Sequence, residues 1–398
     1  MNLESVKARS RIVQLVRRWF DDQGFLEMLT PRLVGLPGQE PYLEPFWTTV
    51  NNPLDKARPE RSRRRGQGGF PAALVTSPEY AMKRLLAAGL DKIYDLGPCF
   101  RNNEPWDGSH DPEFLMLEWY RRDSNVEQLM DDAENMIRWV AGRIKNEEFR
   151  MKNAGDGIPN SEISLNLPLT REISYSESPL VKGDLGDFRR LTVEQAWREY
   201  AGVELAPLLD DREALAKVAV EKFHQTVTPD DTWDDIYFRI FLSVIEPKLG
   251  WPSTDSEDRK SSVSSNETSP LTRRLRAPDP VFLYRYPASQ ASLACKCADD
   301  PRWAERVELY IGPYELANGF AELRDPVEQR ARFDEERGLR SRLGKKTWPS
   351  DEKFLADLPR MGNAAGIAFG VERLAMLLTG AESINDILPF PARERFDR

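Results

Sequence analysis

The stretch Phe100–Tyr120 reads FRNNEPWDGSHDPEFLMLEWY, and its pattern decides how the rest of the chain is interpreted. An apolar run that ends at Arg101 is followed by a polar loop, and a second apolar run covers Phe114 to Tyr120. Aromatic and aliphatic runs that are bounded by Gly, Pro, Asn and Asp are typical of paired β-strands. The stretch therefore predicts a β-hairpin whose loop, residues 102–113, carries most of the polar side chains.

The polar side chains of this hairpin suit a nucleoside triphosphate. The guanidinium fork of Arg101 matches the geometry of phosphate, and an acid such as Glu104 accepts a hydrogen bond from an adenine amino group. The ring of Phe114 offers a flat surface for the base. An ordinary charged hairpin explains the same residues without a ligand, so other segments must separate the two interpretations.

A second segment, Gly366–Leu378, reads GIAFGVERLAMLL and predicts a strand followed by an apolar helix. Glycine at position 370 lets the backbone approach a ligand closely, because it has no Cβ. Arg373 follows at the start of the helix, where its charge can neutralise a terminal phosphate. A buried strand–helix junction with a surface arginine is the alternative.

A third segment, Glu305–Glu322, reads ERVELYIGPYELANGFAE and predicts two antiparallel strands joined near Gly312 and Pro313. On such strands Glu308 and Glu315 are expected to face one another. Two opposed carboxylates repel, and Mg²⁺ removes that cost because it binds through one or two carboxylates plus substrate phosphates. We therefore expect Glu308 and Glu315 to be the metal ligands.

Together these segments resemble the class II aminoacyl-tRNA synthetases: the hairpin resembles motif 2 and the Gly370–Arg373 region resembles motif 3 of that class. The third segment is similar to lysyl-tRNA synthetases. With TSPEYAMKRLL (Thr76–Leu86) and YPASQASLA (Tyr286–Ala294), it is still more similar to their short paralogues, the elongation factor P–(R)-β-lysine ligases. The fold that this resemblance implies is α+β, a class II catalytic core with a mainly antiparallel sheet flanked by helices.

The resemblance implies a nucleotide site in which Arg101 and Arg373 are the catalytic residues. Arg101 would hold the α-phosphate and Arg373 the γ-phosphate of ATP. Lysyl-tRNA synthetases place an acid two residues after the first arginine, where this chain has Asn103, so the residue that reads adenine stays open. The expected ATP-binding residues are Arg101, Asn102, Asn103, Glu104, His110, Asp111, Phe114, Glu315, Leu316, Gly370 and Arg373.

The resemblance also implies an amino-acid site rich in carboxylates. Buried acids without partners are costly, so a cationic substrate such as lysine or β-lysine is their natural counter-charge. The alternative is that the acids pair with Lys83, Arg84 or Arg324. Ala368 stands where lysyl-tRNA synthetases have glycine, which would reshape the pocket by one methyl group. The expected substrate-binding residues are Ser77, Pro78, Glu79, Glu118, Tyr120, Asn318, Phe320, Glu322 and Ala368.

The composition bounds the setting of the protein. The 398 residues are 40% hydrophobic and carry a formal net charge of −9, which argues against a broad nucleic-acid-binding surface. There is no long apolar run for a membrane span and no secretory signal, and three cysteines are too few for a disulfide framework. We expect a cytoplasmic protein whose cysteines are free and bind no zinc.

The order of segments predicts a single catalytic domain over residues 1–398 with flexible inserts at 51–71, 151–190 and 253–280. Helical patterns cover residues 3–22, 125–145, 192–200, 211–223 and 234–245. A segment that resembles motif 1, Gly24–Val34, implies a homodimer. Only about one helix precedes it, so we expect no OB fold for reading an anticodon, and tRNA is an unlikely partner.

The resulting prediction is an ATP-dependent, AMP-forming ligase that uses Mg²⁺. It adenylates (R)-β-lysine or lysine and transfers the aminoacyl group to a lysine of elongation factor P. Two alternatives remain at this point. One is a truncated lysyl-tRNA synthetase, or a paralogue that loads another acceptor. The other is an inactive regulator that binds an amino acid or a nucleotide.

Overall fold

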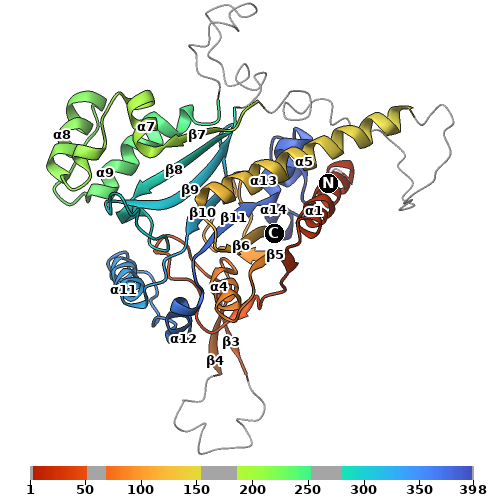
Figure 1. Ribbon diagram of the computed structural model, residues 1–398, viewed down its shortest axis with the longest axis horizontal. Coiled ribbons are helices and arrows are strands. Elements are labelled where there is room, and N and C mark those ends of the chain that lie inside the picture. Colours follow the sequence, from red (N-terminus) through yellow and green to blue (C-terminus); the bar gives the residue numbers. More distant parts are fainter. Residues whose placement is uncertain (1–2, 52–68, 154–185, 252–278, 397–398) are drawn as a thin grey trace, which may run out of the picture. The chain divides into compact units, whose positions relative to one another are not determined.

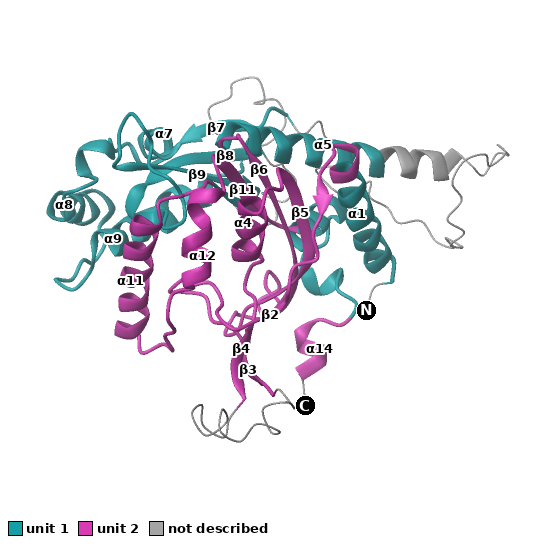
Figure 2. Cartoon of the chain, turned by 60° about the horizontal axis from the view of Figure 1, so that its bottom comes forward, with its two compact units in different colours: residues 1–19, 126–320, 371–389 teal, residues 20–125, 321–370, 390–398 magenta. Residues whose placement is uncertain are grey.

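The computed structural model describes residues 3–51, 69–153, 186–251 and 279–396. These residues form two compact units, coloured separately in Figure 2, and each unit is considered by itself. Unit 1 comprises residues 1–19, 126–320 and 371–389, and unit 2 comprises residues 20–125, 321–370 and 390–398. The single catalytic domain that the sequence predicts stays a prediction.

Unit 2 contains the hairpin that the sequence predicts. Strands β5 (Lys92–Phe100) and β6 (Glu113–Arg122) pair antiparallel along their whole length. Strand β11 (Ala364–Gly370) pairs antiparallel with β6, and β1 (Leu26–Glu27) pairs parallel with β5. The strand order in this unit is therefore β1-β5-β6-β11, which is mainly antiparallel as expected.

A second, smaller sheet and five helical elements complete unit 2. The sheet has the order β2 (Leu33–Val34), β4 (Phe70–Leu74), β3 (Trp47–Val50) and is antiparallel. Helix α4 packs against β5 and β6, and Tyr80 on α4 stacks on Phe354 of α12 with ring centroids 4.1 Å apart. The helical elements are α4 (Glu79–Ala87), α11 (Pro326–Arg342), α12 (Glu352–Asp357), the turn η9 (Leu358–Arg360) and α14 (Ala392–Phe396).

Unit 1 has four strands of its own in the order β10 (Tyr314–Ala321), β9 (Trp303–Ile311), β8 (Val281–Pro287) and β7 (Arg189–Thr192). The pairs β10–β9 and β9–β8 are antiparallel, and β8–β7 is parallel. Helix α5 (Val126–Asn153), the long helix of Figure 1, packs against β9. Helix α1 (Leu3–Asp22) is joined to α13 (Val371–Thr379) by an Arg9–Glu372 ion pair of 2.7 Å.

The helical patterns between β7 and β8 are confirmed. They form a subregion around the buried aromatic side chains Trp197 and Tyr237, whose rings lie 5.1 Å apart. Asp211 and Thr232 are the N-caps of α8 and α9 and accept backbone N–H groups, so each helix begins within one residue of the predicted position. The elements between β7 and β8 are α7 (Val193–Ala196), η3 (Trp197–Ala201), η4 (Ala206–Leu208), α8 (Arg212–Phe223), α9 (Trp233–Ile240), η5 (Phe241–Ile245) and η6 (Glu246–Lys248). Two further turns of unit 1 are η8 (Ala288–Gln290), which follows β8, and η10 (Ile384–Asp386) near the C-terminus.

The three predicted inserts, 51–71, 151–190 and 253–280, lie largely outside the described residues. Their described ends correct the predicted boundaries, because β4 begins at Phe70, β7 begins at Arg189 and α5 extends to Asn153. These ends belong to regular structure because they pair with or continue neighbouring elements. The basic stretch Lys56–Arg65 of the first insert lies outside the described residues.

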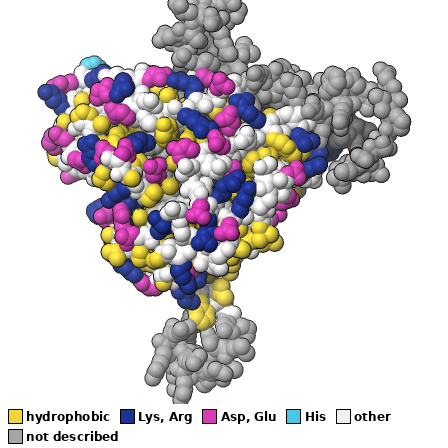
Figure 3. Space-filling view, viewed as in Figure 1, with side chains coloured by type: hydrophobic (Ala, Val, Ile, Leu, Met, Phe, Trp, Pro, Cys, Tyr) yellow, Lys and Arg dark blue, Asp and Glu magenta, His cyan; other side chains and the backbone are white. Residues whose placement is uncertain are grey.

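The surface and the cysteines agree with the composition. Figure 3 shows acidic and basic side chains intermixed over the face that it presents. Cys99, Cys295 and Cys297 are free, as expected. Within the described ranges, every helix is too short or too polar to cross a membrane.

Asp95 on β5 ties the segment after β1 to the main sheet of unit 2. Its carboxylate is fully buried and accepts hydrogen bonds from the backbone N–H of Thr30 (3.0 Å) and the Thr30 hydroxyl (2.7 Å). The guanidinium of Arg32 also pairs with it. A Cβ on Gly97 would lie 2.0 Å from Arg32 Nη2, so a larger residue there would displace the Arg32 guanidinium from its place over the strand. This network positions residues 30–32 beside the sheet.

Replacing Asp95 with alanine should lower the free energy of unfolding by about 3–5 kcal/mol, because Arg32 and Thr30 lose their buried acceptor. Asp91→Ala is the matched control. Its side chain is 78% exposed and lies 3.4 Å from Arg122, so the loss should stay within about 0.5 kcal/mol. Urea unfolding of the three proteins measures both values, and equal midpoints would refute the role given to Asp95.

Candidate active site

The expected site residues of unit 2 share one face of its main sheet. In the β6–β11 register Tyr120 is opposite Gly366, Glu118 is opposite Ala368 and Met116 is opposite Gly370. Paired residues lie on the same side of a sheet, and side chains alternate between sides along each strand. The even-numbered residues of both strands, which include Glu118 and Tyr120, therefore lie on one face of the sheet.

Glu118 is the centre of a buried hydrogen-bond network on this face. Its carboxylate accepts from the Ser77 hydroxyl at 2.6 Å and from the Tyr120 hydroxyl at 2.8 Å. Only 1% of the residue is exposed. Burial and the negative charge of Glu79 raise the pKa of Glu118 to about 8, although the two hydroxyl donors oppose this. The expected residues Ser77, Glu118 and Tyr120 are thus brought into direct contact.

Two more buried carboxylates meet a single lysine beside this network. The ammonium of Lys83 pairs with Glu79 and lies 2.5 Å from Glu322 Oε2. The alternative pairing that the sequence allowed is therefore correct for these two acids, whereas Arg84 pairs with Asp357 instead. Burial raises the pKa of Glu322 although Lys83 opposes the shift. Three carboxylates against one ammonium leave two negative charges unbalanced when all are ionised, so the cluster still favours a cationic ligand.

Gly366 allows this cluster to assemble. A Cβ at position 366 would lie 2.1 Å from Cε1 of Tyr120 and 2.7 Å from Oε1 of Glu322. Any larger residue would displace both side chains, since such contacts are shorter than atoms tolerate. Ala368, the next residue on the same face, packs against the apolar cluster of Val75, Cys99 and Met116.

Arg101 and Phe114 come together at the end of the hairpin. The guanidinium carbon of Arg101 lies 5.1 Å from the centre of the Phe114 ring. The Nε of Arg101 is buried and has no hydrogen-bond partner among the described residues. A buried donor without an acceptor is costly, and a phosphate oxygen would satisfy it. The pair therefore fits a nucleotide.

The loop between β5 and β6 is held by contacts within unit 2. Asn103 has a φ of 62°, a conformation that asparagine tolerates better than most residues. Nε2 of His110 lies 4.0 Å from the Glu104 carboxylate. Hydrogen bonds from Ser109 and His110 lower the pKa of Asp107 to about 2, although partial burial opposes the shift. The residue that reads adenine stays undecided between these side chains.

Asp111 has structural partners that the sequence did not suggest. Its carboxylate accepts from the backbone N–H groups of Ala392 (2.7 Å) and Glu113 (3.1 Å) and pairs with Arg395. These contacts hold α14 against the hairpin loop. The part of Asp111 in ATP binding stays a prediction.

In unit 1 the two expected metal ligands share a face but are not directly opposed. Glu308 is opposite Asn318, and Glu315 is opposite Tyr310, because the register shifts by one residue between Glu315 and Ala317. The prediction that Glu308 and Glu315 face one another across the hairpin is therefore wrong in register. The bulge nevertheless turns Glu315 onto the face of Glu308, Asn318 and Phe320, since one extra residue reverses the alternation.

Glu308 is surrounded by donors on this face. Its carboxylate pairs with Arg306 and accepts from the hydroxyls of Tyr286 and Tyr310, the latter at 2.7 Å. Burial and Glu308 raise the pKa of both tyrosines well above their ordinary value. Arg306 also donates to Asn318 Oδ1 at 3.2 Å. The positive charge of Arg306 is thus held beside the Glu308 carboxylate.

Arg373 of α13 contacts strand β10. Its Nη1 donates to the backbone oxygen of Glu315 at 2.5 Å, beside the buried Leu316. Phe320 packs against the small cluster of Ala291, Ala294 and Ala304. The expected residues of unit 1 (Glu308, Glu315, Leu316, Asn318, Phe320 and Arg373) therefore all lie on or beside β9 and β10.

The donor set of unit 1 fits a hard divalent cation that is shared with phosphates. Within the described part of the chain there is no cluster of three or more His, Cys, Asp and Glu side chains that could form an all-protein metal site. Glu308 and Glu315 supply carboxylate oxygens, and Mg²⁺ needs only one or two of these when phosphates complete its shell. The residues present are compatible with Mg²⁺.

Several residues of these clusters were missed or misjudged from the sequence. Arg306 stands two residues before Glu308 on the same strand, so strand alternation is a signal that could have placed it on the same face. Tyr286 belongs to a segment that the resemblance already singled out. No local signal marks Glu40, whose carboxylate oxygen Oε2 is buried near Ser77 and Glu79 in unit 2.

Known proteins are similar to this chain over nearly its whole length. The family described as tRNA synthetases class II (D, K and N) matches residues 2–394, and the chain belongs to this family of ATP-dependent aminoacyl ligases. Elongation factor P–(R)-β-lysine ligase of Proteus mirabilis strain HI4320 is 32% identical over 392 residues, which cover 98% of this chain and 95% of the relative. The chain is thereby a member of the elongation factor P–(R)-β-lysine ligase group within that class.

Two further relatives carry the same name. The ligase of Yersinia enterocolitica is 32% identical over 388 residues, and that of Pectobacterium atrosepticum is 33% identical over 383 residues. Each alignment covers 96% of this chain and 93% of the relative. The similarity therefore includes both units rather than one of them.

The raised pKa of Glu118 predicts how stability depends on pH. The folded carboxyl titrates near 8 and the unfolded one near its ordinary 4.5, so the folded state holds the proton more tightly between these values. Stability contributed by this group is thus present below about pH 4.5 and is lost as the pH rises toward 8. Glu118→Gln mimics the protonated acid. It should stabilise the protein at pH 8 relative to pH 5.5 by on the order of 2 kcal/mol.

Thermal unfolding without ligand at the two pH values measures this difference. Any cost of the substitution that does not depend on pH cancels between them. Glu113→Gln on the same strand is the control, because its carboxylate is exposed and pairs with Arg395 at the surface. The same pH dependence in wild type and Glu118→Gln would contradict the burial of an ionisable Glu118.

Proposed function

We propose that this protein activates (R)-β-lysine or lysine with ATP and transfers the aminoacyl group to a lysine ε-amine of elongation factor P. The observation that carries the proposal is the cluster of Glu79, Glu118 and Glu322, which are buried with Lys83 as a shared cation. An activated lysine or β-lysine carries two ammonium groups, which matches the two unbalanced negative charges. The names of the relatives support elongation factor P as the acceptor.

The buried network of unit 2 is the centre of the proposed amino-acid site. Glu118, with Ser77 and Tyr120, would bind one ammonium group, and Glu79 and Glu322 would bind the other beside Lys83. Asn318 and Phe320 complete the expected set, together with Pro78. The methyl of Ala368 on the sheet face biases the choice between α- and β-lysine, because one methyl group discriminates by about 1–3 kcal/mol.

The nucleotide would be held by the two arginines. Arg101 holds the α-phosphate and keeps its guanidinium on Phe114, against which the adenine ring lies. Arg373 holds the γ-phosphate, and Gly370 lets the backbone approach it. Asn102, Asn103, Glu104, His110, Asp111 and Leu316 line the nucleotide in this proposal. Glu308 and Glu315 would hold Mg²⁺, which when bound neutralises phosphate charge.

The chemistry then takes two steps. A carboxylate oxygen of the amino acid attacks the α-phosphorus and pyrophosphate leaves, which requires no general base because the carboxylate is already a nucleophile. The acceptor amine next attacks the acyl carbon and AMP leaves. Preorganised charges such as Arg101 stabilise the first transition state, which is usually the largest catalytic contribution.

The assembly and setting are also proposed. The apolar side chains of Leu26, Leu29 and Leu33 are 54%, 86% and 44% exposed, which supports a homodimer formed by the segment after α1. We propose a cytoplasmic location, and a protein rather than tRNA as acceptor. A truncated lysyl-tRNA synthetase or an inactive regulator are the competing functions.

ATP–pyrophosphate exchange with a panel of amino acids tests the proposal. Exchange should require Mg²⁺, should proceed with (R)-β-lysine or lysine, and should be absent with aspartate, because an acidic side chain adds charge to an already negative cluster. Absence of exchange with every amino acid would favour the inactive regulator. Best exchange with an acidic or apolar amino acid would refute the cationic pocket.

Arg101→Ala should reduce exchange by roughly 10²–10³-fold without loss of folding, because it removes a preorganised charge contact to phosphate. Arg122→Ala is the control, since Arg122 ends the same hairpin and pairs with the exposed Asp91 at 3.4 Å. Exchange rates and thermal midpoints are compared for the three proteins. If Arg101→Ala kept near-wild-type exchange, the phosphate role would belong elsewhere.

A further inference from the structure

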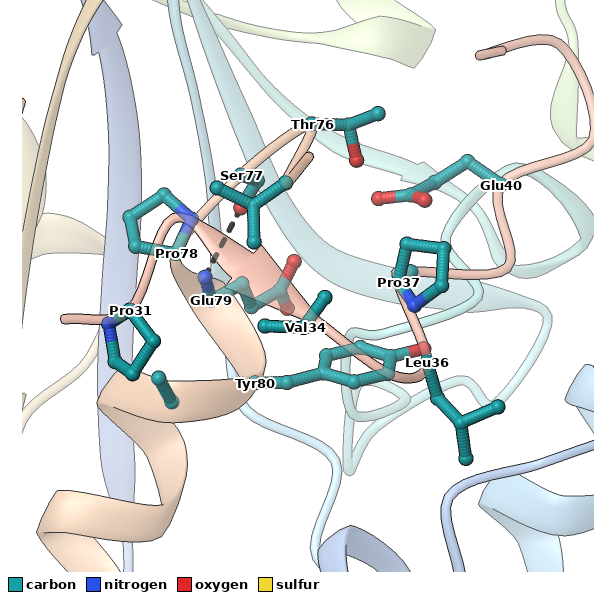
Figure 4. Close-up of a pocket in the computed structure, with 13 residues that line it drawn as sticks. Pro31, Val34, Leu36, Pro37, Glu40, Thr76, Ser77, Pro78, Glu79 and Tyr80 are labelled. Carbon is teal, nitrogen blue, oxygen red and sulfur yellow. Dashed lines mark hydrogen bonds between the residues drawn. The ribbon is translucent and has the colours of Figure 1, made fainter. Parts of the chain in front are cut away.

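A small pocket in unit 2 is lined by residues 31–40 and by the stretch that begins α4, residues 75–81. We call it the Glu40 pocket. Its volume is about 40 Å³, enough for a few water-sized groups such as the end of a side chain, and too small for a whole amino acid. Figure 4 shows the carboxylate of Glu40 and the hydroxyl of Thr76 pointing toward one another at one end of the pocket.

The walls of the Glu40 pocket are apolar and its end is acidic. Pro31, Val34, Leu36 and Pro37 supply hydrocarbon surface, and Glu40 supplies a carboxylate that the proposed amino-acid site does not use. This combination suits an aliphatic chain that ends in an ammonium group, because the methylenes contact the walls and the charge meets the Glu40 carboxylate. A lysine side chain has this chemistry.

One carboxylate oxygen of Glu40 lacks a hydrogen-bond donor within the described part of the chain. This atom, Oε2, is buried. Burial and the charge of Glu79 raise the pKa of Glu40, and a hydrogen bond from its own backbone N–H and the charges of Arg101 and Arg340 oppose the shift. A buried carboxylate oxygen without a partner costs free energy that a bound ammonium would recover.

Arg340 holds the loop that carries Glu40 in one position. Its guanidinium is buried and donates to the backbone oxygens of Glu40 (2.9 Å) and Leu43 (2.7 Å) and to the carboxylate of Glu44 (2.8 Å). These hydrogen bonds from one rigid guanidinium group fix the backbone of the loop from Glu40 to Leu43. The carboxylate is therefore preorganised rather than carried by a loose loop.

Glu40 is within electrostatic range of residues that are proposed to bind each of the two substrates. Glu79 belongs to the proposed amino-acid cluster and Arg101 is the proposed ligand of the α-phosphate, and both act on the Glu40 carboxyl. The bond that breaks during transfer joins the acyl carbon to the oxygen on that phosphorus. A carboxylate that lines a pocket with Ser77 and Glu79 and is within electrostatic range of Arg101 is well placed to meet an incoming amine.

We propose that the Glu40 pocket receives the acceptor lysine, and that Glu40 binds its ε-ammonium and accepts a proton from it. This inference rests on the proposed function and assigns the residue that activates the second substrate. An amine must lose its proton before it can attack, because its lone pair is otherwise in an N–H bond.

The step balances as follows. One N–H bond of the ammonium breaks and its proton moves to the Glu40 carboxylate, which leaves a neutral amine. The nitrogen lone pair forms the C–N bond to the acyl carbon, and the C–O bond to AMP breaks with its electron pair going to the phosphate. The nitrogen loses a second proton to solvent water, which gives the amide. No redox partner is required.

Glu40→Gln separates this role from amino-acid activation. General base catalysis contributes about 10²–10⁴-fold, so transfer to a lysine amine should fall at least about 100-fold. Pyrophosphate exchange should fall less than about threefold. Hydroxylamine is mostly unprotonated at neutral pH and needs no base, so hydroxamate formation should also fall less than about threefold. The acceptors are elongation factor P and Nα-acetyl-lysine amide.

The pH profile provides a readout that a structural role would not change. The titratable and charged groups around the Glu40 carboxyl are Glu79 and Tyr80 of α4, Arg101 after β5 and Arg340 of α11. The defect of Glu40→Gln should shrink as the pH rises toward the pKa of the acceptor lysine, because the amine then loses its proton without help. A defect that is constant with pH would overturn the role as a base.

Glu44→Gln is the matched control, because Glu44 is on the same loop but its carboxylate is occupied by Arg340 and lies outside the Glu40 pocket. The same selective loss of transfer in this variant would show that loop displacement explains the effect, and would overturn the proposal. Equal losses of exchange and transfer in Glu40→Gln would assign Glu40 to activation instead. Failure of the wild type in exchange refutes the proposed function itself.

Discussion

Buried negative charge is the constraint on which the proposed amino-acid site depends. Glu79, Glu118 and Glu322 are taken out of water in unit 2, and Lys83 offsets only part of their charge. Such a cluster is stable only if protons or a bound cation supply the remaining charge. The raised pKa of Glu118 means that this carboxyl holds a proton more tightly, and the proposed diamino substrate would supply the positive charge when it binds. At the proposed site, binding of a cationic substrate would therefore release protons.

The backbone makes this concentration of charge possible in two different ways. In unit 2, Gly366 leaves space that Tyr120 and Glu322 occupy, so the cluster assembles on a flat, regular pair of strands. In unit 1, a β-bulge next to Glu315 rotates that residue onto the face of Glu308. The glycine removes a side chain, and the bulge changes which side of the sheet the following side chains occupy. Both increase the number of polar groups on one face.

The structure also distinguishes residues that hold the site from residues that are free to act. Arg340 and Asp95 are fully occupied by neighbouring groups and fix the loop and the segment that surround the Glu40 pocket. By contrast, Arg101 Nε and Glu40 Oε2 are buried without hydrogen-bond partners among the described residues. Unsatisfied groups of opposite charge within a well-fixed framework are what a site for a phosphate and an ammonium requires.

The sequence by itself determined the elements and the kind of chemistry. The hairpin of β5 and β6 and the helices from α7 to α9 follow from local alternation and residue type, which act over a few positions. The acids of the proposed amino-acid site came from the resemblance to class II synthetases. Only the tertiary structure decided the partners. Lys83 reaches Glu322 across more than two hundred residues, Arg340 reaches the loop of Glu40, and the register of β10 separates Glu315 from Glu308. These contacts depend on how distant strands pack and on a single inserted residue, and neither leaves a periodic signal along the chain.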